Sequence, residues 1–296
     1  MKKKLKVLAV VLCLTLFALM ALGSGETGSN ETKGIGLVDN ESKADGTKAD
    51  VTIEEQKLLD QNGIVITAKE YVTDSIWGDG IKLLIENNTD KTITVGCTAL
   101  IVNNYMISDL FASEVAAGKK ANEVMYLLSD ELEAAGIDNV GQVEIYFHVF
   151  ESSTLDNIFD SDCVTIKTSE FDNMDTKPND GGTELYNEKG IRIVGKAVDE
   201  NSFWGKAILL YCENTSGKNV GISVEEMSIN GLMMTPMFSM NVYNGKMAID
   251  DITILSSELE KNGITEIDKV ELKFHIYDVD TYDTIIDSDT ITFSAK

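Results

Sequence analysis

The chain is poor in most of the residues that recognise polyanions or carry out chemistry. Its 296 residues include two histidines, two prolines, two tryptophans and four cysteines, and arginine occurs once, as Arg192. Acidic residues outnumber basic ones by 49 to 25, which gives a formal net charge of −24. Binding to nucleic acid needs clustered cations that release counterions. The composition therefore argues against nucleic acid as a partner, and against anionic lipid headgroups for the body of the chain.

Motifs of known catalytic sites are also missing from the sequence. There is no G-x-S-x-G stretch, and one histidine in each half of the chain gives no recoverable Ser-His-Asp set. No pair of cysteines or histidines has the spacing of zinc ligands. We therefore expect a protein that is not an enzyme, with no catalytic residues and no cofactor. Paired acidic residues of the glycoside-hydrolase kind remain an open alternative.

The first residues have the pattern of an export signal. A lysine-rich start is followed by an apolar run over residues 7–22, which is short for a membrane-spanning helix. Small residues then favour cleavage near Gly23–Ser24, which predicts a signal peptide over 1–23 and an extracytoplasmic location. The stretch "ALGS" resembles a lipoprotein box, but Ser24 stands where that box needs cysteine. An uncleaved anchor is the alternative, and contact with a membrane is expected only through this segment.

An internal repeat organises the rest of the chain. Residues 62–169 align without gaps on residues 189–296 at an offset of 127, and 37 of the 108 aligned positions are identical. The chain is thus expected to contain two copies of one domain. Residues 24–61 are polar and acidic and predict a disordered linker, and residues 170–188 predict a linker between the domains.

Each copy has the pattern of short strands separated by turns. In the first copy the expected strands cover 63–72, 81–87, 92–103, 105–108, 120–129, 142–150 and 162–168. Asn103-Asn104 and its counterpart Asn230-Gly231 predict a tight hairpin with positive φ angles. Residues 129–136 predict one short helix, capped by Ser129 and ended by Gly136, before the penultimate strand. The pattern predicts a mostly β chain of two tandem immunoglobulin-like antiparallel β-sandwich domains.

Alternation within the penultimate strand identifies its buried face. The alternate residues of 143–149 and of 270–276 are apolar in both copies, so this face should pack on the core. The opposite face carries Glu144, Tyr146, His148 and Phe150, and is expected to contact water. Three cysteines lie outside the signal, and none of them is shared by both copies, so we expect free thiols rather than a disulfide that the fold needs.

A combination of short motifs, most of them repeated in the second copy, resembles a known type of domain. The combination of "GI-I-AK", "WG", "IEN", "ELE--GI", "VE--FH" and "DSD" is similar to a domain of unknown function in exported and lipoprotein-like cell-envelope proteins of Gram-positive gut bacteria. The resemblance covers nearly all of both copies. It implies an envelope location and an immunoglobulin-like fold, and it implies no activity and no site residues.

Two repeated aromatic positions are candidate ligand-binding residues. Trp77 and Trp204 lie in the equivalent stretches "SIWG" and "SFWG", and each could plug the end of a sandwich or form a platform for a sugar or peptide. Weak quenching by acrylamide would support the plug. His148 and His275 are also equivalent and face outward. A structural cross-strand role and a ligand-binding role both stay open for them.

Repeated carboxylates form the candidate metal site. The pattern D-x3-D-x-D occurs in both copies, and clustered carboxylates suit calcium. Entry to the last strand through Asp and Ser turns is the alternative. The six residues are Asp156, Asp160, Asp162, Asp283, Asp287 and Asp289.

These features together predict an exported, non-catalytic protein of the cell envelope. Its tandem domains are expected to bind an unknown protein or glycan, or to act as a spacer. The alternatives are a hydrolase that uses acidic residues on extracellular substrates and a structural spacer stabilised by calcium.

Overall fold

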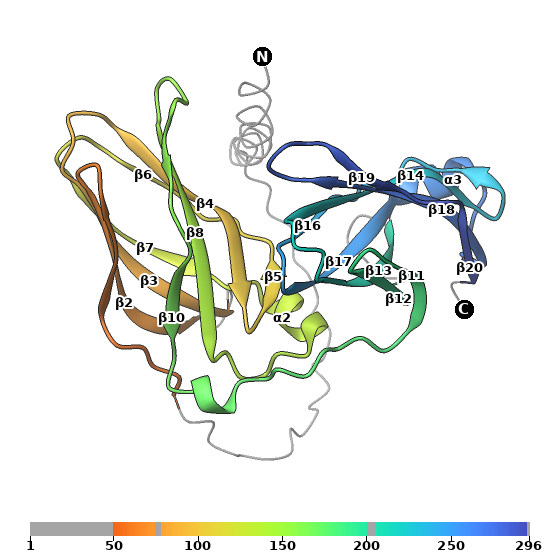
Figure 1. Cartoon of the computed structure of the whole chain (residues 1–296), viewed down its shortest axis with the longest axis horizontal. Coiled ribbons are helices and arrows are strands. Elements are labelled where there is room, and N and C mark those ends of the chain that lie inside the picture. The colour runs from red at the N-terminus through yellow and green to blue at the C-terminus, as the bar shows by residue number, and fades with distance from the viewer. Residues whose placement is uncertain (1–49, 75–77, 200–204, 295–296) are drawn as a thin grey trace, which may run out of the picture. The chain divides into compact units, whose positions relative to one another are not determined.

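Antiparallel strands dominate the computed structural model, which describes residues 50–74, 78–199 and 205–294 (Figure 1). The elements of the first repeat are β1 (Gln56–Gln61), β2 (Ile64–Asp74), β3 (Gly78–Asn87), β4 (Ile93–Val102), β5 (Tyr105–Ile107), β6 (Ala112–Val115), β7 (Lys120–Tyr126), α2 (Ser129–Ala135), β8 (Gln142–Glu151), β9 (Asn157–Asp160) and β10 (Val164–Lys167).

The second repeat follows the same order after a short 3₁₀ turn, η1 (Phe171–Asn173). Its elements are β11 (Thr183–Glu188), β12 (Ile191–Asp199), β13 (Gly205–Asn214), β14 (Val220–Ile229), β15 (Leu232–Met233), β16 (Met240–Val242), β17 (Lys246–Leu255), α3 (Ser256–Lys261), β18 (Lys269–Asp278), β19 (Thr284–Asp287) and β20 (Ile291–Ser294). Each element thus has a counterpart at the offset found in the sequence.

Each repeat builds two antiparallel sheets. In the first repeat one sheet has the order β1-β2-β3-β7, and the other runs β10-β8-β4-β5 with β6 on β4 and β9 on β8. The chain crosses between the sheets three times, from β3 to β4, from β6 to β7 and from β7 to β8, where α2 lies. This pairing of β3 with β7 and of β4 with β8 is the order of an immunoglobulin-like sandwich, so the prediction of a mostly β, immunoglobulin-like fold is confirmed.

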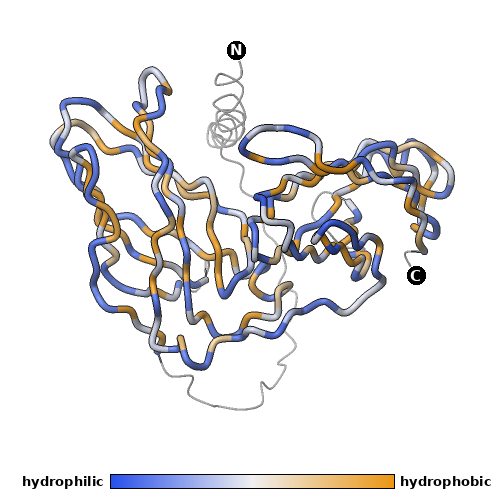
Figure 2. The backbone as a smooth tube through the Cα atoms, in the orientation of Figure 1, coloured by the Kyte–Doolittle hydropathy of each residue, from blue (hydrophilic) through white to orange (hydrophobic). Residues whose placement is uncertain are grey.

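The apolar face predicted for the penultimate strand forms the core. Val143, Ile145, Phe147 and Val149 of β8 are fully buried, as are their counterparts on β18. Figure 2 shows hydrophobic residues along the strands and hydrophilic ones at many turns. On the opposite face of β8, Phe150 is also buried, at 6 % exposure, so this face is less exposed to solvent than the sequence predicts.

The predicted hairpin turns are present in both repeats. Asn103 and Asn104 have φ angles of 47° and 73°, and Asn230 and Gly231 have 52° and 82°. The first asparagine also fixes the start of the penultimate strand, because Asn103 Oδ1 accepts hydrogen bonds from the backbone N of Gly141 at 2.9 Å and of the next residue. Asn230 makes the equivalent contacts, which explains why asparagine stands at this position in both copies.

The predicted helix is present at the expected position, but the prediction of its N-cap is wrong. Gly136 ends α2 in the left-handed conformation with a φ angle of 73°. Ser129, however, does not cap the helix. It is already the first helical residue, the N-cap is Leu128, and no side chain makes a capping hydrogen bond. The same arrangement recurs at α3, where Leu255 is the N-cap.

Both predicted linkers contain ordered strands. Residues 56–61, placed at the end of the 24–61 linker, form β1 on the edge of β2. Residues 183–188 of the 170–188 linker form β11 on β12. The physical reason is the same in both cases. Leu58 and Leu59, like Leu185 and Tyr186, pack against a core, and a few apolar residues suffice to add an edge strand to an existing sheet.

The two repeats share one sheet rather than being joined only by the connecting segment. β5 of the first repeat pairs in parallel with β17 of the second, with Tyr105 opposite Met247 and Met106 opposite Ala248. The rings of Tyr105 and Tyr211 meet edge to face at 6.4 Å. Lys246 Nζ lies 2.5 Å from Glu144 Oε2, both side chains being largely buried. Residues 51–296 accordingly form one compact unit.

Among the described residues, no helix is long and apolar enough to cross a membrane.

Candidate functional site

The two tryptophans proposed as ligand-binding residues lie outside the described residues. Trp77 falls in 75–77 and Trp204 in 200–204. The choice between a plug and a ligand platform therefore stays a prediction.

Each candidate histidine pairs with an aspartate of the repeated acidic motif. His148 on β8 lies directly opposite Asp160 on β9, with 2.5 Å between Nδ1 and Oδ1. His275 and Asp287 repeat the contact between β18 and β19 at 2.6 Å. The sequence missed this pairing because only residues on the same strand were compared. The constant spacing of 12 residues between histidine and aspartate in both copies is the signal that could have found it.

The surroundings of the pair favour a structural role. The His148 ring packs beside Phe150 at 5.3 Å, and the His275 ring stacks on Tyr277 at 5.8 Å. The neighbouring Ser161 is already engaged, because its hydroxyl accepts a hydrogen bond from Phe147 N and donates one to Asp162 O. No hydroxyl nucleophile is thus offered to the imidazole by this motif, which then serves to tie β9 to β8.

The other residues of the acidic motif do not gather into a metal site. Asp156 lies in the turn between β8 and β9, where its backbone O accepts a hydrogen bond from Glu151 N. Asp162 follows β9, and Asp283 and Asp289 hold the equivalent places in the second repeat. Within the described ranges, no three His, Cys, Asp or Glu side chains come together in a way that could hold a metal ion. Calcium binding stays a prediction, and a thermal midpoint that does not move with millimolar calcium would contradict it.

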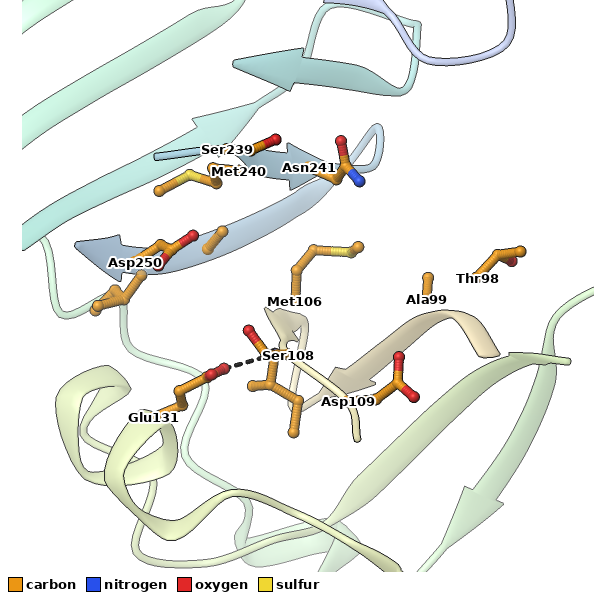
Figure 3. A pocket seen from close by; sticks show the side chains of 13 residues that line it. Thr98, Ala99, Met106, Ser108, Asp109, Glu131, Ser239, Met240, Asn241 and Asp250 are labelled. Carbon is orange, nitrogen blue, oxygen red and sulfur yellow. Dashed lines mark hydrogen bonds between the residues drawn. The ribbon is translucent and has the colours of Figure 1, made fainter. Parts of the chain in front are cut away.

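The described part of the chain contains a cavity where the two repeats meet. Its volume is about 180 Å³, and its walls come from β4, β5 and α2 of the first repeat and from β16 and β17 of the second. Three carboxylic acids line it, namely Asp109, Glu131 and Asp250, together with Met106 and Met240 (Figure 3). The cavity is therefore acidic, with soft apolar walls.

Burial sets the protonation of these three acids. It raises the pKa of Asp109 to about 6, although the carboxylate accepts a hydrogen bond from Phe111 N at 3.1 Å. It raises the pKa of Asp250 to about 7, against the hydrogen bond from Asp251 N at 2.8 Å. The Glu131 carboxylate adds repulsion to both.

Glu131 differs from the other two acids because it has a clear structural contact. Its Oε2 accepts a hydrogen bond from Ser108 N at 2.6 Å, and Glu258 makes the same contact to Thr235 N at 2.9 Å in the second repeat. Burial raises the pKa of Glu131 as well. Glu131 holds the segment after β5 against α2, and Glu258 holds the segment after β15 against α3 in the same way.

Asp109 and Asp250 are specific to the meeting point of the repeats. Asp109 aligns with Pro236, and Asp250 aligns with Glu123, which is exposed on β7. The sequence prediction missed both because it concentrated on residues that the copies share. Carboxyl groups with raised pKa values in a partly enclosed cavity either attract a cationic group, which relieves their repulsion, or hold a proton near neutral pH.

The three described cysteines are free and differ in access. Cys163 is exposed, Cys97 is intermediate and Cys212 is buried. Burial raises the pKa of the Cys97 and Cys212 thiols, so neither has the character of a reactive thiolate.

The chain matches no known family's sequence profile and no curated protein. Among solved structures it is similar to the Salmonella enterica SafA pilin in complex with the SafB chaperone, with 10 % identity over 73 % of this chain and 88 % of that chain, at a TM-score of 0.22. It is also similar to a protein of unknown function from Porphyromonas gingivalis W83, with 9 % identity over 73 % and 89 % of the two chains, at a TM-score of 0.21. At these TM-scores neither resemblance bears on the function of this chain.

Proposed function

We propose that the chain is an exported, non-catalytic protein of the cell envelope whose two immunoglobulin-like repeats act as one binding unit. The carrying observation is the shared sheet, in which β5 pairs with β17 and an acidic cavity lies beside the pairing. The export pattern of residues 1–23 supports the location, and membership of the envelope domain family stays a prediction. Two repeats joined in this way present one fixed surface rather than two sites on a flexible linker.

The chemistry of the cavity favours a basic side chain of a protein or peptide partner. A volume of about 180 Å³ is below the roughly 300–1,000 Å³ of pockets that enclose whole small molecules, so a side chain fits better than a sugar ring. An ammonium or guanidinium group would lie among the carboxyl groups of Asp109, Glu131 and Asp250. It would hold them ionised, because an opposite charge lowers the pKa of a carboxyl group.

The test uses the methionines of the cavity as reporters. The chain from residue 24 onward, labelled on its methionine methyl groups, is titrated with a short lysine peptide and with the same peptide acetylated on the lysine. The methyl signals of Met106 and Met240 are expected to shift with the free lysine only. Asp250→Asn should weaken the response, and Glu123→Gln, which changes the aligned exposed residue, should leave it unchanged.

An equal response to both peptides, or no response at about millimolar peptide, would refute cation binding. Binding with a Kd above about 1 mM is too weak to support the proposed function. Export is tested separately by fractionating cells that make the chain with and without residues 1–23. Loss of the protein from the envelope or medium on removal of this segment is the expected result.

A hydrolase is the second candidate, and one observation favours it. The pKa of Asp250 is raised to about 7 and that of Asp109 to about 6, which is the range of a general acid at neutral pH. The discriminating measurement is turnover of a panel of aryl glycosides between about pH 5 and pH 8. Turnover that disappears in Asp250→Asn would replace the binding proposal, and absence of turnover in the wild-type chain would remove this candidate.

A further inference from the structure

One methionine has opposite surroundings in the two repeats. Met106 of β5 is 8 % exposed, and its identical counterpart Met233 of β15 is 66 % exposed. The preceding residue shows the same contrast, with Tyr105 at 1 % and Leu232 at 42 %. Exposed apolar residues that cluster in this way mark an interaction surface.

The contrast has a direct cause. β5 is covered because β17 pairs with it, whereas β15 ends the order β15-β14-β18-β19 of its own sheet. The counterpart of β17 in the first repeat is β7, and it also ends its sheet, in the order β1-β2-β3-β7. The described chain therefore contains one joined pair, β5 with β17, and the two equivalent edges β15 and β7 without a strand on their outer sides.

We propose that β15 of one copy of this chain pairs in parallel with β7 of a second copy, as β5 pairs with β17 within the chain. By the offset of 127, Leu232 then lies opposite Lys120 and Met233 opposite Ala121. The contact joins two different surfaces, so each added copy exposes a new edge. Such a head-to-tail contact does not close as a two-fold dimer does, and it gives an open assembly or, where the rotation between copies closes, a ring.

The polar contacts of the existing junction have equivalents at the two edges. Within the chain, Lys246 Nζ lies 2.5 Å from Glu144 Oε2, and the residues aligned with them are Lys119 and Glu271. Lys119 is exposed and directly precedes β7. Glu271 lies on β18, which pairs with β14, the strand on which β15 is paired. Opposite charges are therefore present at the positions where the new contact needs them. Glu271 Oε1 already pairs with Lys269 Nζ at 2.7 Å within its own chain, so Lys119 of the second copy shares this carboxylate with Lys269.

The backbone hydrogen bond of the junction also has an equivalent. Met247 N donates to Asn104 O at 3.0 Å. The aligned donor is Lys120 N on the outer side of β7, and the aligned acceptor is Gly231 O at the turn before β15. Unpaired edge groups of this kind are a ready template for adding a strand.

The contact between copies is weaker than the contact within the chain. The second repeat receives β5 on a face that includes Val194, Tyr211 and Ile249, which join the core of the first repeat. The first repeat has Thr67, Leu84 and Asn122 at those three positions, so less apolar surface is buried. Assembly then depends on a high local concentration, as for chains held at one surface. It does not depend on what the cavity binds.

The test is sedimentation velocity on the chain from residue 24 onward, up to about 1 mM, because a weak contact has a Kd in the millimolar to micromolar range. The mean mass should rise continuously past that of a dimer. Met233→Lys should raise the concentration needed by about tenfold or more, since it places a charge in the buried part of the contact. Leu110→Lys, at an equally exposed leucine (66 %) outside both edges, should have no effect.

Charge exchange and chain capping distinguish this contact from others. Lys119→Glu should weaken assembly, and adding Glu271→Lys in the same chain should restore it, while circular dichroism confirms that each variant is folded. Because Met233→Lys keeps β7 intact, small amounts of it should shorten wild-type assemblies. A chain that stays monomeric, a mass that stops at a dimer, or a double variant without recovery would each overturn the proposal.

Discussion

Asp250→Asn should make the protein more stable at neutral pH and leave its stability unchanged in acid. Asp250 lines the cavity between the repeats, and burial raises its pKa from 3.8 to about 7. Asparagine has nearly the same shape and can still accept the hydrogen bond from Asp251 N at 2.8 Å. The substitution therefore removes the charge and little else.

The sign follows from proton binding in the two states. Between pH 4 and pH 7 the folded protein holds a proton on Asp250 that the unfolded chain has released, so the free energy of unfolding falls as the pH rises. The full loss is present above about pH 7, and none remains below about pH 4. About three pKa units correspond to about 4 kcal/mol as an upper limit. Because the cavity opens to water, we expect about 1–2 kcal/mol.

The assay is urea and thermal unfolding of both proteins between about pH 4 and pH 8, the interval set by the two pKa values. At the upper end the variant should melt about 2–8 °C higher, since 1 kcal/mol shifts the midpoint of a chain of this size by about 2–4 °C. The control is Glu123→Gln, which removes a carboxylate from the aligned and exposed position. A stability difference that is the same at both ends of the pH range would refute the reasoning, because a charge effect has to titrate.

Two further predictions test the burial of single side chains. Asn87 is fully buried and donates hydrogen bonds to backbone carbonyls at 2.7 and 2.9 Å. Asn87→Ala should therefore lower the free energy of unfolding, measured with urea, by about 2–4 kcal/mol. The control is Asn88→Ala, which changes the exposed neighbouring residue. A thiol reagent followed by mass spectrometry should label Cys163 in the native protein and Cys212 only after unfolding, and rapid native labelling of Cys212 would contradict its burial.

The sheets were predictable from sequence because strand alternation depends on local residues alone. The apolar set at 143–149 repeats at 270–276, and the structure buries both sets completely. The hairpin at Asn103 and its counterpart were predictable for a similar reason, since their positive φ angles depend on residue type. Edge strands were not predictable in this way. β1 and β11 carry few apolar residues, and only the neighbouring sheet makes them strands.

The candidate sites depended on contacts that the sequence pattern does not contain. His148 meets Asp160 because a turn folds β9 back onto β8, and strand spacing alone gives no such distance. The acidic cavity depends on how β5 meets β17, and the residues of both pairs in this contact are 142 positions apart in the sequence. Asp109 and Asp250 are not shared by the two copies, since they align with Pro236 and Glu123, so the repeat pattern could not indicate them either.

Comparison of the two copies gives the junction a direction. On the receiving side the copies differ, because the second repeat has Val194, Tyr211 and Ile249 where the first has two polar residues, Thr67 and Asn122, and the smaller Leu84. On the donating side, Met106 and Met233 are identical even though Met233 is 66 % exposed. A strand edge kept apolar in water carries a risk of unspecific association. An apolar edge at β15 is explained if another strand covers it when the protein is assembled. β7 of a second copy is the equivalent of β17, which covers β5 within the chain, and we therefore expect β7 to cover β15.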